Sequence, residues 1–313
     1  MRCVAKWLAL AAAALLALSI VAILAVGLRF DIPVEALKPR YAGGASRFVE
    51  VDGLNVHYRD QGPRGAPALL LLHGSSASLH TWEGWERLLR AEFRVVSVDL
   101  PGHGLTGPWP KDGDYSLDGY ARFVDRFTRR IGVERFSLVG NSMGGAVAWT
   151  YAARYPQRAE KLILIDAVGW PRPPAQRFFG FVTAPLTDFA LRWITPRFVV
   201  ARTLRALYGD PAKVEPALVD RYRDLVLRAG NRAAISKRFR AFDPDPALLG
   251  TLRLPVLVLW GGKDWLLLPA EAFRFQNAIA DARLRIYSQA GHMPMEEMPE
   301  ITAQDARAFL RER

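Results

Sequence analysis

Short apolar runs recur along the chain from residue 68 onward, and the stretches between them have helical spacing. Each run is apolar throughout, as is typical of strands that are buried on both faces of a sheet. The runs read "ALLLLHG", "RVVSVDLPG", "RFSLVGNS", "KLILIDAVG" and "LPVLVLWGG", and stretches such as "LDGYARFVDRFTRRIG" separate most of them. Strand, helix and strand in repetition predict an α/β fold, with a mostly parallel twisted sheet that carries helices on both faces.

Two alternating runs precede this pattern. They form the sequence "RFVEVDGLNVHYRDQG" and are separated by Asp52-Gly53. An Asp-Gly pair between two alternating runs predicts a β-hairpin.

One interval is several times longer than a typical connection. About ninety residues lie between Ile165 and Leu254, and they contain helical patterns such as "ALVDRYRDLVLRAGNRAAISKRF". The interval is rich in large aromatic residues, which a solvated loop would not carry: Phe178, Phe179, Phe181, Phe189, Trp193 and Phe198. We therefore expect a helical cap over the end of a strand.

The N-terminal segment Trp7–Leu28 carries no charge and is about as long as the ~20 residues that a bilayer-spanning helix needs. Arg2 and Lys6 precede it, which favours a cytoplasmic N-terminus. The pattern predicts an uncleaved, single-pass membrane helix with the remaining chain in the periplasm or outside the cell. The alternative is a cleaved signal peptide, for which Ala25-Val26-Gly27 is a usable cleavage site.

These patterns divide the chain into five parts. Residues 1–30 form the predicted anchor and residues 31–46 a linker; residues 47–168 are the first part of the core, 169–250 the cap and 251–313 the second part of the core.

Composition narrows the classes of function. The formal net charge is +11, but the excess is spread as single arginines without a block of like charges or a zinc-ligand spacing. We therefore do not expect a nucleic-acid partner. Cys3 is the only cysteine, which excludes an intramolecular disulfide and a cysteine metal cluster.

The run "SLVGNSMGGAVAWTYAARYP" places a serine where a buried strand pattern meets a helical pattern. Residues 140–144 read G-x-S-x-G, and between a strand and a helix this motif predicts a sharp turn that exposes the hydroxyl of Ser142 above the sheet. Ser142 is the candidate nucleophile.

A base and an acid follow in the chain order that such a nucleophile requires. "LVLWGGKDWLLLP" places Asp264 just after a strand, and "IYSQAGHMPMEEMPE" places His292 after the next one. Ser142, Asp264 and His292 therefore form the candidate catalytic triad, in which His292 takes the serine proton and Asp264 orients the imidazole. Asp166 also follows a strand, so it stays open as an alternative acid.

Two backbone N–H groups are candidates for the oxyanion hole. Ser75 follows the early strand in "LLLHGSSASLHTW", and Met143 follows the nucleophile. In the cap, Phe178 and Phe179 lie beside a Pro-rich entrance, and we expect them to line the site for an alkyl chain.

The motifs HGSS, DLPGHG, GNSMGG, GGKD and GHMP occur in the order and spacing of the α/β-hydrolase superfamily, which the chain resembles over residues 46–310. With its N-terminal segment it resembles membrane-anchored bacterial lipases and monoacylglycerol lipases. The resemblance implies an α/β-hydrolase fold and cleavage of carboxylic esters, without a metal or organic cofactor. The expected substrate is a lipid-like ester such as a monoacylglycerol, and the expected state is a monomer that contacts the membrane through its N-terminal helix. Alternatives on this scaffold are hydrolysis of a carbon–carbon bond, perhydrolysis, or a binding protein without catalytic activity.

Overall fold

A computed structural model gives the architecture. It describes residues 6–7, 10, 12–15, 18–19, 21, 28–110, 113–171, 189 and 192–312.

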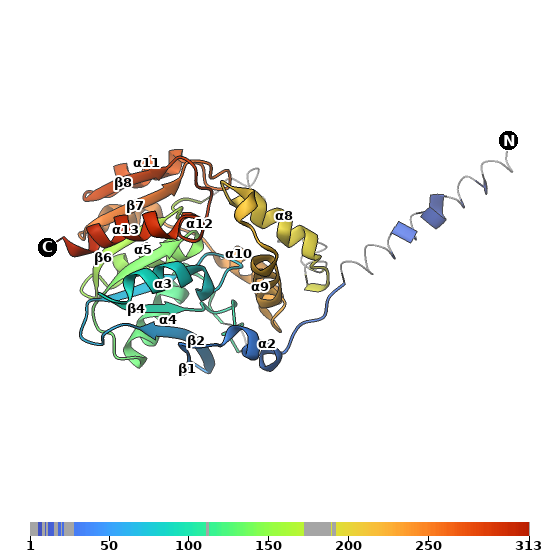
Figure 1. The fold of residues 1–313 in the computed structure, drawn as a ribbon, viewed down its shortest axis with the longest axis horizontal. Helices are drawn as coiled ribbons and strands as arrows, with labels where there is room; N and C mark the ends of the chain where they lie inside the picture. Colours follow the sequence, from blue (N-terminus) through green and yellow to red (C-terminus); the bar gives the residue numbers. More distant parts are fainter. Residues whose placement is uncertain are drawn as a thin grey trace.

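The described part of the chain forms an eight-stranded sheet in the order β1-β2-β4-β3-β5-β6-β7-β8 (Figure 1). Its strands are β1 (Ser46–Val51), β2 (Leu54–Gln61), β3 (Ala68–Leu72), β4 (Arg94–Val98), β5 (Phe136–Asn141), β6 (Ala159–Ile165), β7 (Val256–Gly261) and β8 (Ala282–Tyr287). The pairs β1/β2 and β2/β4 are antiparallel, and the other five pairs are parallel. The predicted hairpin is confirmed, since Val51 pairs with Leu54 around Asp52-Gly53.

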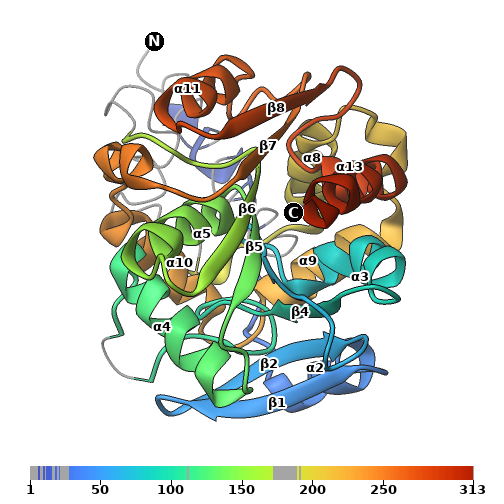
Figure 2. The same cartoon turned by 90° about the vertical axis from the view of Figure 1, so that its left-hand side faces the viewer.

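Helices cover both faces of the sheet (Figure 2). On one face lie α4 (Leu117–Arg130), α5 (Met143–Arg154) and α11 (Ala270–Ala278), and on the other lie α3 (Glu83–Leu89) and α13 (Pro299–Arg311). Side chains of a strand point to alternate faces, and every residue of β3 from Leu69 to Leu72 is buried. Leu70 and Leu72 join the core under α4 and α5, whereas Leu69 and Leu71 join the core under α3 and α13. This two-sided burial explains the uninterrupted apolar runs of the sequence.

Between β6 and β7 the chain forms helices that lie together at one end of the sheet (Figure 1). They are α8 (Arg197–Leu207), α9 (Pro216–Val226) and α10 (Asn231–Ala241), with the short 3₁₀ turns η3 (Pro211–Lys213) and η4 (Pro246–Thr251). Two other short elements, η1 (Leu79–Trp82) and α12 (Pro294–Glu297), lie in the core. We call the helices α8–α10 the cap.

The segment before β1 packs against the cap. Leu28 forms a bridge with Ile194, and Ile32 forms one with Arg228. The helix α2 (Val34–Tyr41) follows, and the Tyr41 hydroxyl donates a hydrogen bond of 2.8 Å to Asp224 of α9.

The structure corrects the expected membrane anchor. No helix among the described residues is long and apolar enough to cross a bilayer, which takes about 20 apolar residues. Leu28, expected as the last residue of the span, instead forms a bridge with Ile194. The prediction of a single-pass membrane protein with a periplasmic or extracellular domain, held to the membrane by that helix, is therefore wrong.

Candidate active site

Ser142 occupies the turn between β5 and α5. Its backbone has φ 53° and ψ −116°, a region that residues with a side chain rarely adopt. The turn is fixed from both sides, because Ser142 N–H donates to Ile165 O over 3.0 Å and Val168 N–H donates to Ser142 O over 3.1 Å. Strain of this kind at one serine, between a buried strand and a helix, is the geometry of a nucleophile elbow.

The glycines of the motif are required by close backbone contacts. A Cβ on Gly144 would lie 2.2 Å from Leu72 O, and a Cβ on Gly140 would lie 2.2 Å from Gly144 O. Neither contact is possible for a larger residue without moving β3 or α5. The spacing G-x-S-x-G thus follows from the tightness of this turn.

His292 and Asp264 are brought together as the sequence predicted. Nδ1 of His292 lies 2.6 Å from Oδ2 of Asp264, and the two residues are 3% and 2% exposed. Because a carboxylate only accepts, we assign the proton of the neutral ring to Nδ1, which leaves Nε2 as the free base. Oδ1 of Asp264 accepts from the N–H groups of Leu266 and Leu267. Burial opposes the charge of Asp264, but His292 and these hydrogen bonds outweigh it and lower the pKa of Asp264.

Asp166, the alternative acid, lies beside Asp264, and no hydrogen bond between its side chain and His292 is found among the described residues. It is fully buried, and its Oδ1 accepts a hydrogen bond of 2.9 Å from Gly261 N–H. Burial, the charge of Asp264 and a hydrogen bond with Asp264 raise the pKa of Asp166 well above its ordinary value of 3.8. Asp166 is therefore the carboxyl group of this pair that keeps its proton to the higher pH.

The raised pKa of Asp166 predicts how stability depends on pH. In the unfolded chain Asp166 ionises near pH 3.8, whereas in the folded protein it keeps its proton to a higher pH. The stability that its neutral form contributes is complete below pH 3.8 and is lost progressively as the pH rises from there through the folded pKa. An asparagine side chain cannot ionise, so the melting temperature of Asp166→Asn minus that of the wild type should increase from pH 5 to pH 9. Thermal unfolding of both proteins at four pH values measures it. A difference that is constant over this range would contradict a protonated Asp166.

One carboxylate oxygen each from Asp166 and Asp264 and one ring nitrogen of His292 lie within 4.8 Å of one another. By distance, these three residues could therefore hold a metal ion. Their arrangement also fits hydrogen bonding without a metal. Asp264 lies within hydrogen-bond distance of His292 Nδ1, and Asp166 accepts from Gly261 N–H.

The predicted oxyanion donors flank the elbow. Met143 is the first residue of α5, and the N–H groups of a first helical turn have no partner inside the helix. Ser75 follows Gly74, whose added Cβ would lie 3.2 Å from Cβ of Ser142, so this loop packs directly against the nucleophile. No hydrogen bond from Ser75 N–H to another described residue is found. As oxyanion donors, the two N–H groups stay a prediction from the sequence.

Three polar contacts that sequence reasoning missed hold the loop of His292. Nδ2 of Asn141 donates to His292 O over 3.1 Å, and His292 N–H donates to Leu207 O at the end of α8 over 2.7 Å. Oε2 of Glu297 accepts from Gly291 N–H over 2.9 Å. Glu297 and Leu207 stand in no motif, so the sequence offered no signal for them; Asn141 stands inside the G-x-S-x-G motif.

Two other buried histidines of this region, His57 and His73, have structural partners. His57 Nδ1 lies 2.7 Å from Oδ2 of Asp99, and Asp99 also accepts from Leu79 N–H and Leu105 N–H. Nε2 of His73 accepts from Leu100 N–H over 3.0 Å. These contacts hold the backbone at Leu79, Leu100 and Leu105.

Phe178 and Phe179, the expected substrate-binding residues, lie outside the described residues. Their role stays a prediction from the sequence.

Comparison with known families settles the broader assignment. A family model described as alpha/beta hydrolase fold matches residues 67–299, which is most of the chain and includes Ser142, Asp264 and His292. The protein belongs to the α/β-hydrolase family. The fold expected from the sequence is thereby confirmed, apart from the anchor corrected above.

Three relatives of this α/β hydrolase indicate the range of its family. A dihydrolipoyllysine-residue acetyltransferase component of the acetoin cleaving system from Cupriavidus necator is 30% identical over 90% of this chain and 72% of its own length. A 2-hydroxy-6-oxononadienedioate/2-hydroxy-6-oxononatrienedioate hydrolase from Burkholderia vietnamiensis is 30% identical over 85% of this chain and 96% of its own length. The crystal structure of a bacterial membrane phospholipase A, a virulence factor, is 30% identical, covers 97% of this chain and 98% of its own, and has a TM-score of 0.73.

Proposed function

We propose that the protein is a serine hydrolase that cleaves carboxylic esters of lipid-like substrates, such as monoacylglycerols, through an acyl-enzyme on Ser142. The observation that carries this proposal is the buried hydrogen bond between His292 and Asp264 at the same end of the sheet as the strained elbow of Ser142.

In the proposed reaction, Oγ of Ser142 attacks the ester carbonyl carbon while Nε2 of His292 takes the hydroxyl proton. The N–H groups of Ser75 and Met143 hold the oxyanion, and Asp264 stabilises the imidazolium. His292 then gives the proton to the leaving alcohol, which leaves the acyl group on Ser142. A water molecule, deprotonated by His292, releases the acid and restores the serine.

The lipid-like substrate class rests on two further observations. The solved structure of the membrane phospholipase A aligns with nearly the whole chain. In addition, the insertion between β6 and β7 carries many aromatic residues, which suit an alkyl chain because each buried CH₂ contributes about 0.8 kcal/mol.

The hydrolase from Burkholderia vietnamiensis favours a second candidate, hydrolysis of a carbon–carbon bond. The two candidates share a nucleophile and differ in the bond that breaks, so direct assay separates them. We expect kcat/KM for p-nitrophenyl and glyceryl esters to exceed that for 2-hydroxy-6-oxo-dienoates by about 100-fold or more, and to rise from acetate to longer acyl chains. Faster turnover of the dienoates would overturn the ester assignment.

A further inference from the structure

Arg238 is a buried cation without a buried anion to pair with. It lies on α10 and is 2% exposed, and among the described residues it forms no ion pair with a carboxylate. Its guanidinium donates one hydrogen bond, of 2.8 Å, from Nη1 to Gly102 O, while Nε has no partner within the described structure. An unpaired buried charge is costly, and one carbonyl oxygen compensates for little of that cost.

The nearest acidic group of this loop cannot serve as the missing partner. Asp99 lies just before the turn at Gly102, and its two oxygens accept from His57 and from the N–H groups of Leu79 and Leu105. Burial lowers the pKa of Arg238, and the rings of Tyr120 and Tyr115 act in the opposite direction.

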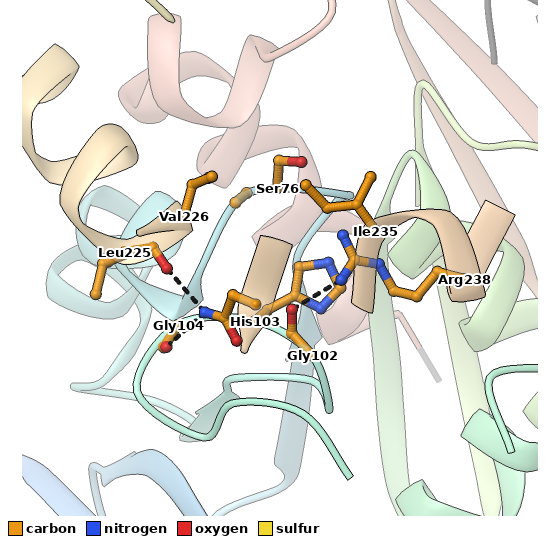
Figure 3. Close-up of a pocket in the computed structure, with 10 residues that line it drawn as sticks. Ser76, Gly102, His103, Gly104, Leu225, Val226, Ile235 and Arg238 are labelled. Carbon is orange, nitrogen blue, oxygen red and sulfur yellow. Dashed lines mark hydrogen bonds between the residues drawn. The ribbon is translucent and has the colours of Figure 1, made fainter. Parts of the chain in front are cut away.

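Arg238 lines a small cavity between the cap and the core (Figure 3). Its volume is about 10 Å³, which is room for one water-sized group and hence for one oxygen of a larger ligand. Figure 3 shows that the guanidinium lies beside the ring of His103. Nε2 of His103 has no partner among the described residues, and burial together with the charge of Arg238 lowers the pKa of His103, so the guanidinium is the positive charge at this cavity.

The cavity is close to the proposed reaction centre. Ser76, on its core side, is the residue after the oxyanion donor Ser75, and it has φ 61°. Gly74 packs against Ser142, and the chain from Gly74 to Ser76 spans at most roughly 7 Å. The loop that carries the predicted oxyanion donor Ser75 and packs against Ser142 therefore also lines the cavity of Arg238.

We propose that Arg238 is a specificity-determining residue that binds a carboxylate or phosphate oxygen of the substrate, so that the preferred esters carry an anionic group a few bonds from the scissile carbonyl. The unused Nε–H of the guanidinium is a charge-assisted donor that one oxygen of a carboxylate or phosphate can accept from. This inference rests on the proposed ester hydrolysis at Ser142 and names the substrate class of that same site.

Matched substrates test the inference in the full-length protein. The first pair is p-nitrophenyl hexanoate and mono-p-nitrophenyl adipate, which differ in a terminal methyl or carboxylate group. The second pair is a monoacylglycerol and the same acylglycerol bearing a phosphate. Arg238→Met should lower the ratio of kcat/KM, anionic over neutral, by at least about tenfold in one pair, or ~1.4 kcal/mol. The pair that responds identifies the source of the anion.

Two variants provide the comparison. Arg238→Lys keeps the charge but loses the planar edge, and it should lower the ratio by severalfold. Lys237→Met removes an exposed cation from the same helix and should keep the wild-type ratio. Ratios that stay within about twofold of wild type in Arg238→Met, for both pairs, would overturn the inference.

A wild-type measurement covers the case in which Arg238 variants do not fold. Adipate should inhibit hexanoate hydrolysis at a concentration at least about tenfold lower than uncharged adipamide. Equal inhibition by the two compounds overturns the inference. If all four esters are hydrolysed and their kcat/KM values do not depend on the anionic group, only this inference is overturned. If none of the four esters is hydrolysed, the proposed function is overturned.

Discussion

Replacing Ser142 or His292 with alanine is expected to lower kcat for a simple ester by about 10⁴-fold or more, because the members of a triad act as one unit. Without Oγ there is no nucleophile, and without the imidazole the hydroxyl keeps its proton. For the same reason, kcat of the double variant, with alanine at both positions, should lie within about threefold of kcat of either single variant. Initial rates with p-nitrophenyl butyrate measure all three.

The control is Ser288→Ala, which removes an exposed serine and should retain wild-type activity. Each variant should also keep its circular dichroism spectrum. A folded Ser142→Ala protein that retains a tenth of the wild-type rate would contradict the role of Ser142.

Asp264→Asn is expected to lower kcat by about 10⁴-fold, whereas Asp166→Asn should retain activity within about tenfold of wild type. In Asp264→Asn the new side-chain amide would present a donor to His292 and favour the wrong tautomer. The amide of Asp166→Asn, by contrast, preserves what a neutral Asp166 provides: an oxygen that accepts from Gly261 N–H and a group that donates to Asp264.

The two asparagine variants are matched, since each replaces one buried oxygen of the same carboxyl pair. Rates measured side by side at pH 7.5 with one ester give the comparison. If Asp166→Asn is inactive and Asp264→Asn active, Asp166 is the acid of the triad.

The sequence predicted the inner part of the sheet well because strands such as β3, β4, β5 and β7 are buried on both faces. Runs such as that of β3 carry no polar position, and the structure divides them between two cores, with Leu70 on one side and Leu71 on the other. The turn at Ser142 could be predicted equally well from the sequence. Gly140 and Gly144 are required there because the surrounding backbone lies too close for any larger residue.

The N-terminal segment was predicted from hydropathy alone. Trp7–Leu28 has the length and the apolar composition of a membrane span, but composition does not report what a segment contacts. In the structure its last residue pairs with Ile194, and Tyr41 beyond it donates to Asp224 of the cap.

The state of Asp166 and the isolation of Arg238 were equally beyond the sequence. Both depend on which charged groups lie close together in the folded protein. Asp166 and Asp264 are 98 positions apart in the chain, so no local sequence motif contains both of them. An arginine in a helical pattern reads as a solvated residue, whereas burial of Arg238 against Gly102 appears only when the cap meets the core.

The most direct test of the central claim is labelling by a fluorophosphonate, which reacts with activated serines, followed by peptide mapping. We predict one adduct per chain, on Ser142, that forms within minutes on the wild-type protein and is lost in Ser142→Ala and His292→Ala. An unlabelled wild-type protein, or an adduct that persists in Ser142→Ala, would contradict the account.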